Sequence, residues 1–73
     1  MGEKVLGRRK IAFEMKRELV IGAEVYYSVD SAVDFLMERL KLTKQEALTY
    51  FKELDVCDLI DFVPEATVFL FLI

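Results

Sequence analysis

The 73-residue chain has no histidine, one cysteine, and three glycines that stand far apart. Without histidine it lacks the side chain that most often acts as a general base or metal ligand near neutral pH. The lone Cys57 excludes an internal disulfide and a paired-cysteine zinc site, and its neighbours Asp55 and Asp58 disfavour a reactive thiolate. Acidic pairs such as Asp30 and Asp34 are interpreted as helix-start and surface residues. No glycine-rich loop is present to cradle a phosphate. From the missing histidine, the lone cysteine and this missing loop together, we expect neither an enzyme nor a bound cofactor or metal.

Long uncharged apolar stretches are also missing, since none approaches the roughly 20 residues that a membrane-spanning helix needs. No leader pattern of a basic region, an apolar stretch and a small-residue cleavage site is present, so we expect a cytoplasmic protein without a membrane segment. What the chain does contain is 55% hydrophobic and 32% charged residues, which excludes intrinsic disorder. Its length fits one domain over residues 1–73, because two separate cores would each be too small.

Apolar residues recur at three- and four-residue steps from Glu3 to Val20, which predicts a helix. We expect it to stop at Gly22, since glycine accepts the left-handed conformation that commonly ends helices. A strand is the alternative, because Ile11, Phe13 and Met15 also alternate. The residues that follow them lack the turn formers of a hairpin, so the helix is preferred.

Two shorter elements are predicted next. The segment Ala23–Val29 is rich in β-branched and aromatic residues, which favours a strand. Asp30 or Ser31 can then cap a second helix, whose apolar stripe runs to Leu40.

The last part of the chain predicts a third helix and a hairpin. Thr43 and Glu46 have the spacing of a capping box, so a helix is expected from Thr43 to about Asp55–Asp58. Two apolar runs, Leu59–Val63 and Thr67–Ile73, flank a proline-containing linker and predict a β-hairpin. The second run does not alternate with polar residues, so we expect both of its faces to be covered, by a second copy or another partner.

This order of helix, strand, helix, turn, helix, strand, turn and strand is that of the winged helix-turn-helix family. The pattern from Ala32 to Leu54, with its tight turn at Lys41–Thr43, resembles that family, and Asp58–Ile60 resembles the entry into its first wing strand. The family often has a glycine in the turn, where Lys41 stands here. The resemblance implies a small α+β winged-helix domain.

In that family the helix after the turn commonly enters the DNA major groove, and the hairpin touches the backbone or the minor groove. The resemblance therefore implies that the third helix contacts double-stranded DNA. Glutamine suits adenine edges, threonine suits several bases, and lysine suits guanine or phosphate. The same side chains are also ordinary on a solvated helix surface. The residues expected to face DNA are Thr43, Lys44, Gln45, Thr49 and Lys52.

The charge is acidic overall, with a net value of -3 and a pI near 4.9, so the chain on average repels DNA. It is also uneven. Residues 1–19 hold six basic and three acidic side chains, whereas the remainder holds four basic and ten acidic ones. The basic run of Arg8, Arg9 and Lys10 is predicted to hold DNA phosphates beside the third helix.

Two functions therefore stay open. One is a small DNA-binding transcriptional regulator of winged-helix type that forms a homodimer. The other is a non-enzymatic protein-interaction module or inhibitor, which binds a partner or itself through the apolar C-terminal strand and the acidic hairpin. The residues expected at that protein interface are Phe62, Val68, Phe69, Phe71 and Ile73.

Overall fold

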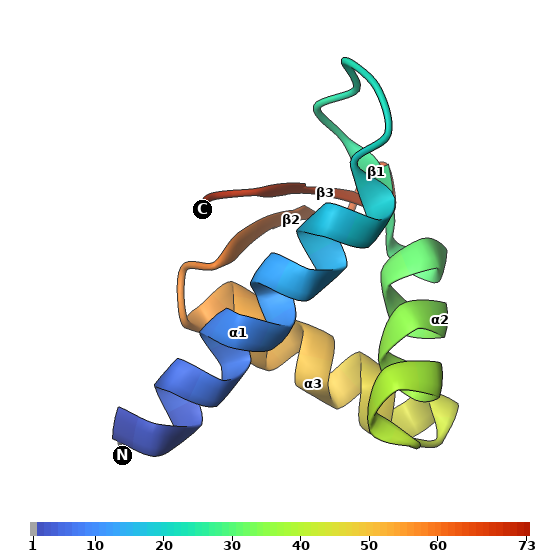
Figure 1. Ribbon diagram of the computed structural model, residues 1–73. Helices are drawn as coiled ribbons and strands as arrows, with labels where there is room; N and C mark the ends of the chain where they lie inside the picture. Colours follow the sequence, from blue (N-terminus) through green and yellow to red (C-terminus); the bar gives the residue numbers. More distant parts are fainter. Residues whose placement is uncertain (1) are drawn as a thin grey trace.

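The structure is a computed structural model that describes the backbone of residues 2–73 and the side chains of residues 7–73. It is a small α+β domain, as predicted, with helices packed against a three-stranded antiparallel sheet (Figure 1). The elements along the chain are α1 (Gly2–Leu19), β1 (Tyr27–Ser28), α2 (Val29–Leu40), α3 (Lys44–Val56), β2 (Ile60–Val63) and β3 (Val68–Phe71).

The last strand in the sequence lies in the middle of the sheet, because the strand order is β1-β3-β2. Phe69 of β3 pairs with Tyr27 of β1 on one side and with Phe62 of β2 on the other. The predicted hairpin is confirmed. Its turn is closed by the amide of Ala66, which donates to the carbonyl of Val63 at 3.2 Å.

The helix α1 confirms the first helical prediction and excludes the alternative strand, because Ala12 and Met15 lie on its fully buried face. Its predicted stop is wrong. The helix ends at Leu19, and Gly22 does not have a positive φ. A loop from Val20 to Tyr26 follows. Only Tyr27–Ser28 of the predicted strand 23–29 pairs with β3, so β propensity alone did not define the length of this strand.

The helix α2 begins earlier than the sequence indicated. Its N-cap is Ser28, whose hydroxyl accepts from the amide of Asp30 at 3.1 Å, so neither Asp30 nor Ser31 is the cap. Burial of Val29 explains the difference, because this residue packs into the core as the first residue of the helix. The helix ends at Leu40, and its C-cap, Lys41, adopts the left-handed conformation with φ 57°. A lysine thus makes the turn that a glycine makes with less strain.

The helix α3 starts with the predicted capping box. The hydroxyl of Thr43 accepts from the amide of Glu46 at 3.2 Å, and the Glu46 carboxylate accepts from the amide of Thr43 at 2.9 Å. The two bonds satisfy amide groups that a helix start would otherwise leave without partners. They set the direction in which the helix leaves the turn.

Aromatic rings join α3 to the sheet at the centre of the core. Phe51 of α3 contacts Phe69 edge-on, with ring centroids 5.2 Å apart, and contacts Phe62 in the same way at 5.5 Å. Leu36 of α2 and Met15 of α1 are fully buried in the same cluster. This packing holds α3 by one side only, which leaves its opposite side at the surface.

Candidate nucleic-acid and protein interfaces

The solvent side of α3 carries three of the five residues that were expected to face DNA. Gln45, Thr49 and Lys52 are exposed on the side of the helix away from the buried Phe51. Lys44 is also exposed, but it lies in the first turn, about two turns before Phe51 on nearly the same side of the helix. The Thr49 hydroxyl donates to the carbonyl of Gln45 at 3.1 Å and can still accept a hydrogen bond. The structure therefore brings one cation, an amide and a hydroxyl together on one exposed helix surface, with a second cation, Lys44, at the start of the helix.

Thr43, the fifth predicted residue, lies at the start of that surface but has a structural task. Its side-chain oxygen accepts the amide of Glu46 in the capping box. A hydroxyl in that position retains its own proton for donation, so contact with a phosphate would add to the cap and not replace it.

The carboxylates on α3 all accept hydrogen bonds from within the fold. Glu46 accepts from the backbone of Thr43, Glu53 accepts from Arg8, and Asp55 accepts from the amide of Phe62 at 3.4 Å. Within residues 7–73, neither Lys44 nor Lys52 forms an ion pair. Among the carboxylates of α3, Glu53 is the one paired with a described cation, Arg8, whereas the exposed Glu46 keeps its negative charge.

The predicted basic cluster on α1 is divided by the helix geometry, because successive residues of a helix point about 100° apart. Arg8 turns inward, where its Nε donates to a Glu53 carboxylate oxygen at 3.0 Å and its guanidinium lies 5.7 Å from the centroid of the Tyr50 ring. The hydrogen bond to Glu53 raises the pKa of Arg8. Arg8 therefore has a carboxylate partner within the fold that Arg9 and Lys10 lack, and a shared contact of the three with a phosphate stays a prediction.

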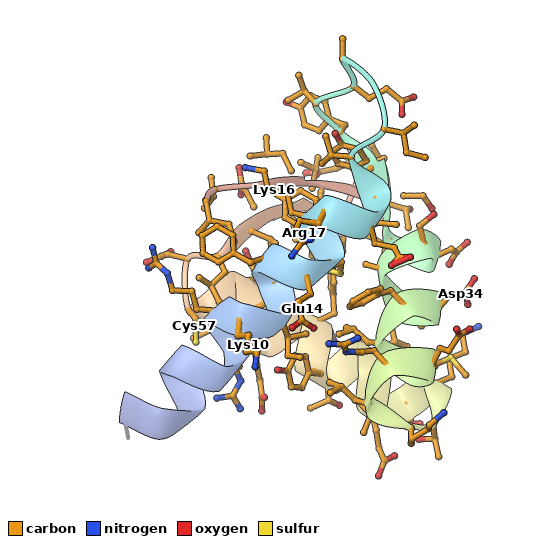
Figure 2. The ribbon with its side chains drawn as sticks, in the orientation of Figure 1. Lys10, Glu14, Lys16, Arg17, Asp34 and Cys57 are labelled. Atoms are coloured by element: carbon orange, nitrogen blue, oxygen red, sulfur yellow. The ribbon has the colours of Figure 1, made fainter. Side chains whose placement is uncertain are left out.

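Arg9 and Lys10 remain exposed on α1. The Arg9 guanidinium lies 5.6 Å from the centroid of the Phe13 ring, and Figure 2 shows Lys10 and Arg17 on the outward side of the helix. Lys16 turns toward the sheet and donates to the carbonyl oxygen of Ile73. The side chain of Lys4, part of the same basic segment, lies outside the described residues.

Basic side chains are distributed unevenly between the two ends of the molecule. The segments 18–38 and 53–73, which include all three strands and most of α2, contain no lysine or arginine. Outside α1, the cations lie at the end of α2, in the turn and on α3. They are Arg39, Lys41, Lys44 and Lys52.

The two faces of β3 differ, because successive side chains of a strand point to opposite sides. Phe69 is fully buried against the helices, and Phe62, Phe71 and Ile73 pack against the same core. Of the five residues predicted at a protein interface, Val68 is therefore the one that turns to the outer face. The other four lie toward the core, where Phe69 has no accessible surface with which to contact a partner, whereas Phe62, Phe71 and Ile73 are only half-buried.

The outer face of the sheet carries aliphatic residues that the sequence analysis did not select. Val63, Val68 and Leu70 are half-buried and lie outside the described core cluster, and Leu72 is 51% exposed. A signal for this division was present in the sequence, since Phe69 and Phe71 alternate with smaller aliphatic residues along the strand.

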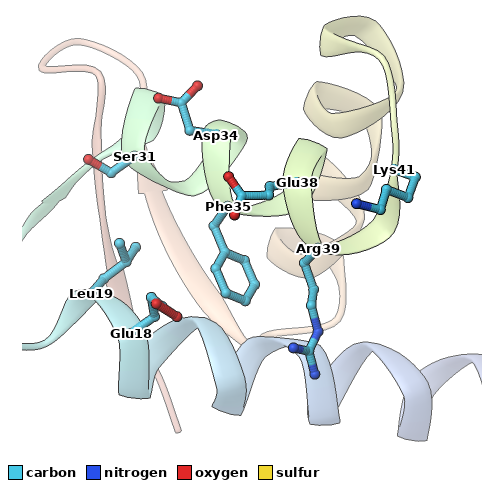
Figure 3. Close-up of a pocket in the computed structure, with 8 residues that line it drawn as sticks. All are labelled: Glu18, Leu19, Ser31, Asp34, Phe35, Glu38, Arg39 and Lys41. Atoms are coloured by element: carbon cyan, nitrogen blue, oxygen red, sulfur yellow. The ribbon is translucent and has the colours of Figure 1, made fainter.

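A cleft of about 520 Å³ lies between α1 and α2 (Figure 3). Glu18, Asp34 and Glu38 line it, and Arg39 reaches across to form an ion pair with Glu14 of α1. Within residues 7–73, no three histidine, cysteine or acidic side chains are placed to hold a metal ion. Among the described helices, none combines the length and apolarity required to cross a membrane.

Comparisons of this chain with known protein families, with curated proteins and with solved structures find no match.

Proposed function

We propose that this chain is a DNA-binding transcriptional regulator of winged-helix type, in which α3 enters the major groove. The observation that carries the proposal is the solvent side of α3. It presents Gln45, Thr49 and Lys52 together, with the exposed Lys44 at the start of the same helix, while Glu53 of this helix is paired with Arg8. The capping box and the left-handed turn at Lys41 support it further, because they join α2 to α3, and the two helices run in clearly different directions (Figure 1), as in a helix-turn-helix.

Each of these side chains has a suitable partner on DNA. Gln45 can pair with both N6 and N7 of an adenine, and Thr49 can contact a base edge. Lys44 and Lys52 can each bind a phosphate or a guanine, and Lys41 at the turn is placed to contact the backbone. The exposed Lys10 adds a further phosphate contact, from the part of α1 that meets α3 through Arg8.

The hairpin has a smaller role in this proposal than the wing has in the resembling family. Asp61 is exposed on β2 and Glu65 lies in the turn, so phosphates would repel both side chains. DNA binding in this proposal then depends mainly on the lysines of α3 and of the turn before it. A net charge of -3 keeps the affinity modest and makes it steeply dependent on salt.

The proposal is tested by titrating isotopically labelled protein with a random-sequence duplex at low and at moderate salt, following backbone amide shifts. Shifts concentrated from Thr43 to Lys52, weakening with salt, are expected. Lys44→Ala and Lys52→Ala should each lower the dependence of log K on log salt by about 0.9. The matched control is Arg17→Ala, which removes an exposed cation from α1 away from α3.

Gln45→Ala should change the preference among duplex sequences more than the affinity for random DNA, because base contacts specify whereas phosphate contacts position. Amide shifts that are absent at low salt, or that are spread evenly over α1 and the sheet, would contradict the proposal.

A second candidate function is a protein-interaction module, and the aliphatic outer face of the sheet favours it. Residues Val63, Val68, Leu70 and Leu72 lie there, outside the described core. An exposed apolar surface of this kind is typical of a protein contact. The same titration separates the two functions, because a module of this kind leaves the amides of α3 unchanged when DNA is added.

A further inference from the structure

The outer face of the sheet combines aliphatic side chains with a purely acidic border. Asp61 is exposed beside Leu70, its direct partner in the register of β2 and β3. Glu65 is exposed in the hairpin turn, and no lysine or arginine occurs anywhere in residues 53–73. In Figure 1, α3 lies below the strands and α1 passes in front of them, which leaves the upper side of the sheet uncovered by helices. This surface suits an apolar group flanked by cations.

The outward side of α1 has the complementary chemistry. Phe13 is 42% exposed there, and the guanidinium of Arg9 lies over its ring. Arg17 follows one turn later and is also exposed (Figure 2). Within residues 7–73, neither Arg9 nor Arg17 forms an ion pair. The outward side of α1 therefore carries an aromatic ring between two arginines, and the aliphatic stems of arginine side chains can also cover apolar surface. The ring suits the aliphatic side chains of the sheet, and the guanidinium groups suit the carboxylates at its border.

We propose that the outer face of the sheet binds the outward side of α1 of a second copy of this chain, head to tail. A symmetric contact between two sheet faces would bring Asp61 and Glu65 of both copies into one interface, without a cation from either sheet. The head-to-tail contact sets Arg9 and Arg17 of one copy against those carboxylates of the next, and covers Phe13 with Val68, Leu70 and Leu72. Charge complementarity therefore selects the second arrangement.

Such a contact uses two different surfaces. In a pair, one copy therefore still has a free sheet face, and the other still has a free α1 surface. Assembly then continues to a closed ring or an open chain, depending on the rotation between copies. The exposed side of α3 belongs to neither surface, and it remains accessible in the assembly.

The test measures the mass of the full chain in solution by sedimentation over a range of concentrations, at low and at high salt. The average mass is expected to rise above 8.5 kDa with concentration and to fall back at high salt. Asp61→Lys and Arg17→Glu should each weaken the association at least about fivefold, because an attractive contact becomes repulsive. An equal mixture of the two variants should restore it, since the reversed sheet of one then meets the reversed helix of the other.

The matched controls are Asp34→Lys on α2 and Lys52→Glu on α3, which make the same charge changes at exposed positions outside both surfaces. Circular dichroism establishes that each variant folds. A wild-type chain that stays at 8.5 kDa at every concentration overturns the proposal. So does a symmetric sheet dimer, which Asp61→Lys would strengthen and Arg17→Glu would leave unchanged.

Discussion

The end of the molecule formed by α3 and the turn before it contrasts with the end formed by the sheet. On α3 the exposed side is polar and carries the cation Lys52, with Lys44 exposed at the start of the helix. On the sheet the exposed side is aliphatic, and Asp61 and Glu65 are the charges at its border. The net charge of -3 is an average over these two surfaces and describes neither. Arguments about partners therefore have to be made surface by surface.

Local hydrogen bonding produces much of this contrast. The acids of α3 are used in folding, since Glu46 completes the capping box and Glu53 pairs with the part-buried Arg8. At the sheet, the carboxylate of Asp61 forms no ion pair within the described side chains. A cation of the fold thus offsets the charge of Glu53 on α3, whereas no described cation offsets that of Asp61 at the sheet.

The largest expected effect separates the two faces of one strand. Phe69→Ala should lower the free energy of unfolding by about 3–5 kcal/mol, because it empties a fully buried position between Phe51 and Tyr27. Leu70→Ala, the next residue on the outer face, should cost less than about 1 kcal/mol. Urea denaturation followed by circular dichroism measures both. If both variants lost the same free energy of unfolding, Leu70 would lie in the core, and the outer side of the sheet would not be an exposed aliphatic surface.

A smaller effect separates structural from exposed residues on α3. Thr43→Ala should destabilise the fold by about 1 kcal/mol, because it removes the acceptor of the Glu46 amide. Thr49→Ala, on the same exposed side, should change stability by less than about 0.5 kcal/mol. Thermal denaturation of the two variants checks the difference. A Thr43 variant as stable as the wild type would show that the cap does not hold α3 in place.

The smallest effect concerns the contact between α1 and α3. Burial raises the pKa of Tyr50, and the nearby Arg8 opposes that rise. The folded state therefore holds the phenol proton more tightly than the unfolded chain does. The protonated Tyr50 phenol contributes fully to stability below about pH 10, the ordinary pKa of tyrosine. This contribution is lost as the pH rises through the higher pKa that Tyr50 has in the folded state.

Stability at alkaline pH should accordingly fall less in Tyr50→Phe than in the wild type. Denaturant titrations at several pH values above neutrality measure the difference between the two chains, in which the contributions of the lysines cancel. Parallel curves would mean that the Tyr50 hydroxyl is equally solvated in the folded and unfolded states.

Much of the fold was predictable because its signals are local. The apolar periodicity of α1, the capping box of Thr43 and Glu46, and the proline-containing hairpin depend on residues within a few positions of one another. Predictions failed where a distant contact decided the outcome. Ser28 caps α2 because the burial of Val29 starts that helix earlier, and β1 is short because only two of its residues pair with β3.

For the candidate surfaces, the sequence by itself determined which residues of α3 face solvent, since a helix with one buried stripe leaves its other side exposed. It also determined the separation of charge along the chain. Only the tertiary structure decided that Arg8 is bound by Glu53, 45 residues away, and that Phe69 faces the core while Leu70 faces outward. The reason is that periodicity describes which side chains share a face, whereas the packing of other elements decides which face is buried.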